Sequence, residues 1–190
     1  MAIEGDLIRA LGARSVRFVA IGVWAVNQYA QDIREAFSTK DKDLFLPLDP
    51  ENLVRAWAAC ESVGLDLWAG EEPLDQPHDL VIARAVVELR ALTRAVDGKN
   101  LFVDLTLVMA GFDFDTAWDQ RRIFQLDGAT LPVARLEHIV TSKATAGRAK
   151  DRLFLETHAQ VLGELKRRDE ALRRRKKNGG SDMPDFPSTP

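Results

Sequence analysis

The sequence is nearly devoid of cysteine: among its 190 residues, Cys60 carries the single thiol. One cysteine excludes an internal disulfide, and scarce cysteine is typical of proteins of a reducing cytoplasm. Cys60 lies among Ala58, Ala59 and Val63 in a segment with helical character. We therefore expect a buried, inert thiol rather than a reactive one.

Long apolar runs are also missing. The longest, from Phe18 to Val26, is interrupted by Gly22 and falls far short of the roughly 20 residues that span a bilayer. The first ten residues, MAIEGDLIRA, lack the basic start and the apolar stretch of a signal peptide. These absences predict a cytoplasmic protein without a membrane partner.

Positive charge is scarce except in one segment. The net charge is −3, yet residues 166–177 (KRRDEALRRRKK) hold eight Lys or Arg against two acids. The rest of the chain is therefore acidic, which suits a site where carboxylates hold a metal ion. The basic segment predicts a contact with RNA or another polyanion. The alternative is a solvated helix end, where cations interact favourably with the helix dipole.

The succession of expected elements predicts a mixed α/β (α+β) fold, a sheet flanked by helices with a helical C-terminal part. Apolar runs of strand length alternate with helical patterns, and Asp49 precedes one of these as an N-cap. Residues 80–93 fit either a helix or a strand hairpinned through Asp97-Gly98. The expected strands are 17–21, 41–46, 65–68, 101–109, 123–126 and 131–133, and the expected helices are 3–11, 24–36, 51–62, 113–121, 135–146 and 149–175.

Three parts of the chain are expected. Residues 1–133 would form the core, and residues 134–177 a helical part. Residues 178–190 are rich in Gly, Pro and Ser, and this composition predicts a disordered tail.

A pair of aspartates opens the second expected strand. Asp41 and Asp43 are two residues apart, and because side chains alternate along a strand, both carboxylates fall on one face. Two like charges side by side are unfavourable unless a cation lies between them. Mg²⁺ prefers oxygen ligands and keeps several waters, which leaves room for substrate phosphates. The alternative is a solvated strand end.

A third carboxylate, Asp104, interrupts the apolar run LFVDLTLVM. A buried carboxylate without a partner is costly, so it must find a cation, and an arginine such as Arg17 or Arg90 is the alternative to a metal ion. If this strand lies beside the Asp41 strand, three carboxylates converge. That is a ligand set for two metal ions, which activate an attacking hydroxyl and stabilise a leaving phosphate.

In their order along the chain, these motifs resemble the DNA polymerase beta-like nucleotidyltransferases. They are most similar to the small bacterial members related to the AbiEii abortive-infection toxins. The resemblance rests on FVAIGVWAVNQYA followed by STKDKDLFL, then on VDLTLVMAGFDFDTAW and LPVARLEHIVTSKATAGRAKD, and it covers about residues 16–160. The family opens with a strand, a Gly-Gly or Gly-Ser pair, a helix, and a T-x-D-x-D strand.

The resemblance implies transfer of a nucleoside monophosphate from an NTP to a hydroxyl, with release of pyrophosphate. Asp41, Asp43 and Asp104 would be the catalytic residues and would hold a two-ion Mg²⁺ site. Backbone N–H groups that follow the glycine would cradle the β- and γ-phosphates. The matched nucleotide-binding positions are Gly22, Val23, Thr39, Lys143, Arg148, Lys150 and Asp151. The toxin-type members add an RNA acceptor and a cognate antitoxin to the expected partners.

Two positions depart from the family pattern. Val23 stands where the second small residue belongs, and its branched side chain would crowd a triphosphate. Lys42 lies between the two aspartates where an apolar residue is usual, and it would point into packed core. Both departures motivate an alternative function: a catalytically degenerate protein of the same fold that acts as a binding or regulatory module. For the last motif, the alternative is an ordinary helical ion pair between Arg148 and Asp151.

Overall fold

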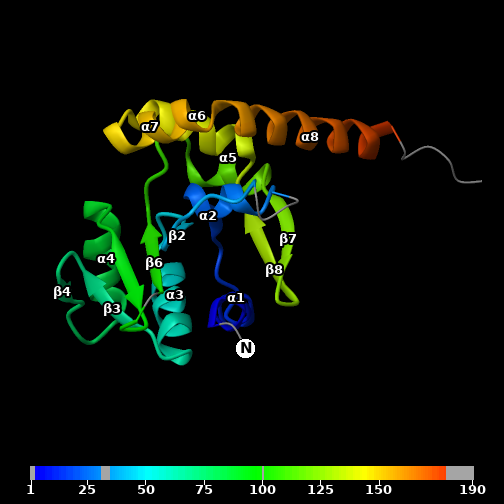
Figure 1. Ribbon diagram of the computed structural model, residues 1–190. Helices are drawn as coiled ribbons and strands as arrows, with labels where there is room; N and C mark the ends of the chain where they lie inside the picture. The colour runs from blue at the N-terminus through cyan, green and yellow to red at the C-terminus, as the bar shows by residue number, and fades with distance from the viewer. Residues whose placement is uncertain (1–2, 31–34, 100, 179–190) are drawn as a thin grey trace, which may run out of the picture.

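The computed structural model describes residues 3–30, 35–99 and 101–178, and it confirms the predicted mixed α/β fold (Figure 1). The strands are β1 (Val19–Ile21), β2 (Asp41–Phe45), β3 (Asp66–Ala69), β4 (Glu72–Pro73), β5 (Thr93–Val96), β6 (Phe102–Thr106), β7 (Arg122–Leu126) and β8 (Ala129–Val133). The helices are α1 (Ile3–Ala13), α2 (Gly22–Asn27), α3 (Pro50–Ser62), α4 (Leu80–Leu89), α5 (Phe114–Asp119), α6 (Leu136–Ala146), α7 (Ala149–Thr157) and α8 (Ala159–Asn178).

The eight described strands form one mixed sheet in the order β4-β3-β5-β6-β2-β1-β8-β7. β2 runs parallel to β6 and antiparallel to β1, and β5 runs antiparallel to β6. The strand of Asp104, β6, therefore lies inside the sheet, between β5 and β2. The sheet register brings β2 and β6 side by side, which is the arrangement that convergence of the aspartates requires.

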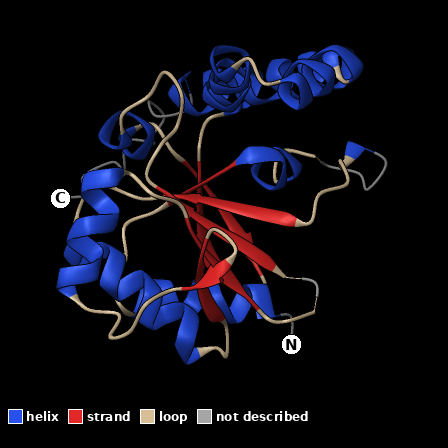
Figure 2. Ribbon diagram, turned by 90° about the vertical axis from the view of Figure 1, so that its left-hand side faces the viewer, coloured by secondary structure: helices blue, strands red, loops and turns tan. Residues whose placement is uncertain are grey.

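One face of the sheet packs against the helices of the N-terminal half. α1 contacts β8 and α3, and α3 in turn contacts β3 and α4. The indole Nε1 of Trp57 in α3 donates a hydrogen bond of 3.1 Å to the Thr93 hydroxyl in β5, and both residues are buried. Figure 2 shows helices on both sides of the strands. This face carries most of the apolar core, and Cys60 in α3 is buried within it, as expected.

The last three helices lie together along the side of the molecule toward which β6 points (Figure 1). The expected long helix over 149–175 is divided, because α7 ends at Thr157 and α8 begins at Ala159. β8 ends at Val133 and α6 begins at Leu136, so the expected division at 133/134 falls between the sheet and these helices. A separation into two domains stays a prediction.

Two other expectations change in the structure. The helix expected over 24–36 ends at Asn27, because the Asn27 side chain turns the chain back: its Nδ2 donates to the Phe37 carbonyl and its Oδ1 accepts from the Phe37 N–H, both at 2.8 Å. Residues 80–93 are neither all helix nor all strand. α4 ends at Leu89, Arg90 adopts a left-handed conformation, and β5 begins at Thr93.

The expected N-cap and the expected hairpin are both present. Asp49 accepts hydrogen bonds from the backbone N–H groups of Glu51 and Asn52 at the start of α3, and β5 and β6 pair as the antiparallel hairpin. Residues 179–190, which hold nearly all of the expected disordered tail, lie outside the described residues. No helix in the described ranges is long and apolar enough to cross a bilayer.

Candidate active site

Three predicted carboxylates lie on one face of adjacent strands. Asp43 in β2 is the register partner of Asp104 in β6, and it is also the partner of Ile21 at the end of β1. Asp41 lies two residues before Asp43 on the same strand, so alternation places it on the same face. The structure therefore brings together the aspartates that the sequence singled out.

Gly22 leaves the space that the Asp43 carboxylate fills. Its φ is +71°, a conformation that favours glycine, and a Cβ added there would clash with the Asp43 carboxylate, lying 2.9 Å from its Cγ. β1 thus ends against Asp43, and α2 starts at this contact without a side-chain cap. A glycine at this position is required both by the turn and by the close approach of the carboxylate.

Asp43 carries its negative charge at a cost. Burial raises the pKa of its carboxyl to about 6, and the neighbouring Asp104 and Asp41 carboxylates act in the same direction. Lys143 and Lys150 oppose this shift because their positive charges favour the ionised form. The site as it stands therefore has more negative charge near Asp43 than the two lysines balance.

Asp104 is held by an arginine that the sequence analysis did not select. Arg94 in β5 is its register partner and binds it through two hydrogen bonds, Nε to Oδ1 at 2.5 Å and Nη2 to Oδ2 at 2.9 Å. Arg17 instead pairs with Asp115 at 2.9 Å, and Arg90 caps α4. In the sequence, Arg94 alternates with Thr93 and Ala95, and the structure buries those two residues while Arg94 lies on the opposite face of β5.

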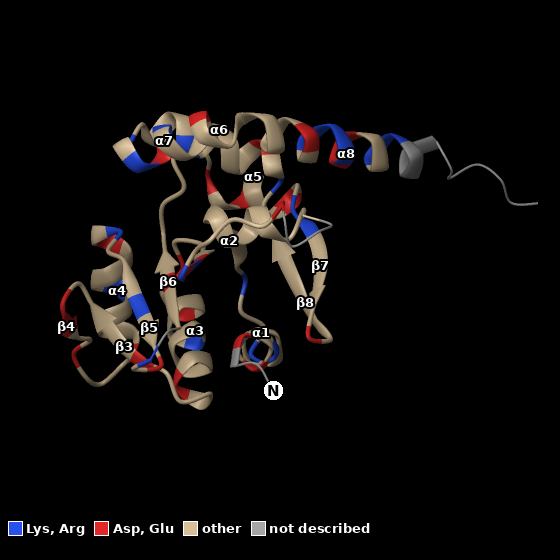
Figure 3. Ribbon diagram, viewed as in Figure 1, with Lys and Arg blue, Asp and Glu red and all other residues tan. Residues whose placement is uncertain are grey.

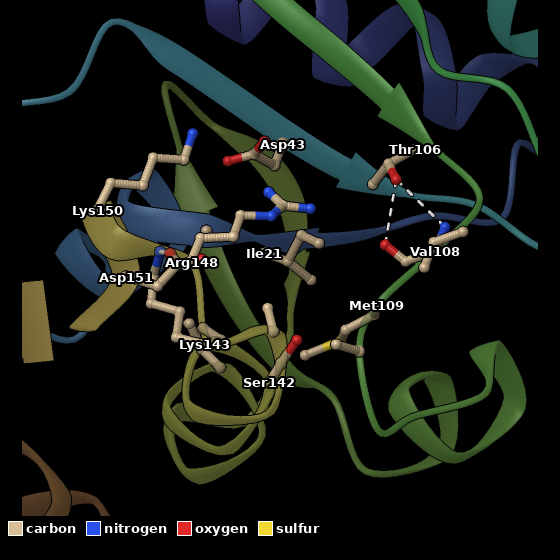
Figure 4. A pocket seen from close by; sticks show the side chains of 14 residues that line it. Ile21, Asp43, Thr106, Val108, Met109, Ser142, Lys143, Arg148, Lys150 and Asp151 are labelled. Atoms are coloured by element: carbon tan, nitrogen blue, oxygen red, sulfur yellow. Dashed lines mark hydrogen bonds and ion pairs between the residues drawn. The ribbon is translucent and has the colours of Figure 1, made fainter.

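A cavity of about 200 Å³ opens beside Asp43, between the strands and α6–α7 (Figure 4). We call it the basic cavity, because Arg148 and Lys150 extend toward Asp43 in it. Its lining also includes residues that the sequence analysis passed over, which come from the end of β6, from the segment after it and from α6. These residues are Thr106, Val108, Met109, Ala110, Ile139, Ser142 and Ala146.

Lys143 and Asp151, both in the lining of the basic cavity, form a buried ion pair. The Lys143 ammonium lies 2.8 Å from Asp151 Oδ1, and the two side chains are 16% and 6% exposed. The same ammonium lies 5.2 Å from the centre of the Phe154 ring. Asp151 therefore pairs with Lys143 across the α6–α7 turn, and the contact between Asp151 and Arg148 is a backbone hydrogen bond of 3.0 Å.

The remaining predicted positions lie at the border of the site or behind it. Thr39 precedes β2, and its hydroxyl donates to the Asp41 carbonyl at 3.2 Å. Val23 is half-buried in α2, and it is absent from the residues that line the basic cavity. Lys42 points away from the carboxylates, where its ammonium pairs with Glu4 of α1 at 2.9 Å. The core thus accommodates Lys42 by supplying a counter-charge.

The donor set around Asp43 fits a hard divalent cation in part. Asp41 and Asp43 offer oxygen ligands of the kind that Mg²⁺ prefers, and burial together with the neighbouring carboxylates raises the pKa of Asp43, a shift that a bound cation would oppose. Across the described residues, no three acidic, His or Cys side chains are arranged to hold a metal ion as they stand. Both oxygens of Asp104 are bound to Arg94 instead.

Comparison with known proteins supports the fold. The chain is similar to the solved structure of the antibiotic-resistance factor ANT(2'')-Ia, a nucleotidyltransferase, with a TM-score of 0.52 over 93% of this chain and 94% of that one. The sequence identity is 14%. No protein-family model and no curated protein matches the sequence. At this identity the likeness establishes a nucleotidyltransferase-type fold, and the activity has to be argued from the site.

Proposed function

We propose that the protein is a Mg²⁺-dependent nucleotidyltransferase that moves a nucleoside monophosphate from an NTP to a hydroxyl acceptor. One observation carries the proposal: a half-buried carboxylate, Asp43, faces a cavity whose far wall is basic. Carboxylates for a metal ion on one side and cations for a polyphosphate on the other are what a triphosphate site needs. The nucleotidyltransferase-type fold supports the same function.

In this proposal the basic residues of the site would bind the phosphates, and the acidic residues would bind the metal ion. Arg148 and Lys150 face Asp43 across the basic cavity and would neutralise the phosphates of the NTP. Lys143 would hold the α6–α7 turn in place through Asp151 and would add its charge at the cavity wall. The backbone at Gly22, next to Asp43, would allow the phosphates to approach closely. Mg²⁺ bound to Asp41 and Asp43 would supply Lewis-acid stabilisation of the phosphates.

The transfer would proceed by in-line displacement. The acceptor oxygen forms a bond to the α-phosphorus, the bond from that phosphorus to the bridging oxygen breaks, and pyrophosphate leaves with the electron pair. The hydroxyl proton passes to Asp104, which lies beside Asp43 on the neighbouring strand. Positioning and charge stabilisation would supply most of the rate enhancement.

A labelled-nucleotide assay tests the proposal. Wild-type protein is incubated with each α-labelled NTP, Mg²⁺ and a cell extract or total RNA, and pyrophosphate release is followed in parallel. We expect transfer by the wild type and none by the Asp41→Asn/Asp43→Asn double variant. Asp119→Asn, at an exposed position in α5, is the control and should keep full activity. Activity retained by the double variant would refute the assignment.

A binding or regulatory module of the same fold is the second candidate. The Arg94–Asp104 pair favours it, because it occupies the third carboxylate with an internal cation. Val23, by contrast, lies outside the lining of the basic cavity, so crowding by this side chain is a weaker argument for a degenerate site. Tight binding of Mg²⁺–NTP without pyrophosphate release would favour the module over the enzyme.

The more specific expectations remain predictions. An AbiEii-like toxin role with a cognate antitoxin, and an RNA acceptor at residues 166–177, extend the proposed function. In α8 basic and acidic residues occur together (Figure 3). Two residues of the 166–177 segment form ion pairs within the protein: Arg168 binds Glu35 at 2.7 Å, and Asp169 binds Arg122 at 3.2 Å. RNA binding through this helix should weaken steeply with salt, and salt-independent binding would contradict it.

A further inference from the structure

A second cavity lies three strands away from Asp43, over β3 and β5 and the start of β6. It has a volume of about 320 Å³ and is lined by side chains of β3, β5 and β6 and by the turns that flank them, among them Trp68, Arg94, Val96 and Phe102. We call it the Trp68 cavity. Trp68, Arg94, Val96 and Phe102 are each half-buried, so their side chains form a floor of aromatic and aliphatic surface that is open to solvent.

The sheet register connects the two cavities. Trp68 is the partner of Arg94, Arg94 of Asp104, and Asp104 of Asp43. Residues that are directly opposite each other in a sheet project from the same face, so these four form one row across β3, β5, β6 and β2. Arg94 lies at the junction, because it lines the Trp68 cavity and binds Asp104, while Asp43 lines the basic cavity.

We propose that the Trp68 cavity is the acceptor subsite and that it takes an uncharged, hydroxyl-bearing molecule with a planar ring. This inference rests on the proposed function. The phosphates of the NTP belong on the basic side of Asp43, where Arg148 and Lys150 lie, so the acceptor must approach the α-phosphorus from the other side. The Trp68 cavity lies on that side, at the end of the row that contains Asp104.

The charges of the Trp68 cavity favour an uncharged ligand. The Arg94 guanidinium is bound to Asp104 by both hydrogen bonds, and the exposed Lys99 and Glu71 add one charge of each sign. A polyanion such as RNA would find little net positive charge here, and a polycation would find little net negative charge. The surface that remains for recognition is that of Trp68 and Phe102, on which a planar ring can stack.

Arg94 would position the acceptor as well. Its guanidinium lies 5.7 Å from the centre of the Phe102 ring, and its side chain is 36% exposed. An acceptor hydroxyl that reaches Asp104 replaces Arg94 as the hydrogen-bond partner of one carboxylate oxygen, and the other oxygen stays bound to Arg94. The carboxylate would then remain oriented while it accepts the hydroxyl proton.

The test compares four classes of acceptor with α-labelled ATP and Mg²⁺. The probes are phenyl β-glucoside and adenosine as neutral molecules with a planar ring, methyl β-glucoside as a neutral match without a planar ring, glucosamine as a cation, and oligouridylate as an RNA. We expect label on a neutral probe with a planar ring. Preferential labelling of the neutral match, the cation or the RNA, or no label on either neutral probe with a planar ring while Mg²⁺–ATP still binds, would overturn the subsite.

Variants of Trp68 separate the acceptor subsite from the nucleotide site. Trp68→Leu should raise the acceptor KM by about 5- to 100-fold, the range for loss of one ring stack, without a change in the Kd of Mg²⁺–ATP. Trp68→Phe should largely restore the acceptor KM. Trp118→Leu, which changes a half-buried indole in α5, is the matched control.

A Trp68→Leu effect on the ATP Kd instead would assign the cavity to the nucleotide base. Failure of the wild type to bind any of the four Mg²⁺–NTPs would refute the proposed function itself.

Discussion

Replacement of Gly22 by alanine should damage both the stability and the ligand affinity of the protein. Two separate physical effects act at this position. The φ of +71° disfavours any residue with a Cβ, and the new Cβ would clash with the Asp43 carboxylate. Gly128, in the β7–β8 turn, is a matched control, because its φ is +77° and a Cβ there would meet nothing within 4 Å.

The two variants allow the effects to be separated in magnitude. A left-handed conformation costs an L-residue about 1–2 kcal/mol, and this cost applies to both Gly22→Ala and Gly128→Ala. At Gly22 the Asp43 side chain must also leave its rotamer, at about 0.5–1.5 kcal/mol. We therefore expect Gly22→Ala to lose roughly 1.5–3.5 kcal/mol of unfolding free energy, and Gly128→Ala about 1–2 kcal/mol.

Urea denaturation measures the stability term, and isothermal titration with Mg²⁺–ATP measures the functional one. A displacement of Asp43 worth about 1.4 kcal/mol corresponds to a tenfold loss of affinity, so Gly22→Ala should bind up to about tenfold more weakly. Gly128→Ala should bind as the wild type does. If both variants lose the same stability and Gly22→Ala keeps its affinity, the contact between Gly22 and Asp43 does not shape the site.

Three further substitutions address the charges of the site. Without divalent cations, Asp43→Asn should stabilise the protein above about pH 6 by up to about 3 kcal/mol, because the pKa of Asp43 is raised from 3.8 to about 6 in the folded state. The wild type loses about this much unfolding free energy as the pH rises from about 4 to about 6. A difference in unfolding free energy between Asp43→Asn and the wild type that does not shrink toward pH 4 would contradict this prediction. Arg94→Gln should increase Mn²⁺ affinity several-fold in electron paramagnetic resonance titrations, because Asp104 loses its internal cation; an unchanged affinity would mean that the pair does not compete with the metal ion. Lys143→Met should cost up to roughly 3–5 kcal/mol in urea unfolding, since it leaves the Asp151 carboxylate buried without a partner. The double change with Asp151→Leu should recover most of that loss, and a double variant as unstable as the single one would count against a buried pair.

Local patterns in the sequence were sufficient for most of the fold. Runs of apolar residues marked six of the eight described strands, among them β7 and β8, and Asp49 marked the start of a helix. These features depend on neighbours within a few residues, and such neighbours are visible in the sequence. The end of α2 was missed because it depends on Asn27, whose side chain binds the backbone of Phe37, ten residues away.

The candidate site was predictable from local patterns to the same extent as the fold. Period-two alternation placed Asp41 and Asp43 on one face, and the polar residue in an apolar strand identified Asp104. The sequence could not show which cation would approach each carboxylate. That choice depends on strand order and register, which are set by packing of the whole sheet.

The sequence by itself determined six of the eight described strands, most of the helices, and which acidic residues share a face, because these follow from the geometry of short segments; β4 and β5 were not expected. Only the tertiary structure decided the partners of the charges. Arg94 reaches Asp104 because β5 lies next to β6, and Lys42 reaches Glu4 because α1 packs behind β2. Each buried charge needs a counter-charge within a few ångströms, and the fold supplies it from residues that are distant in sequence or on another strand.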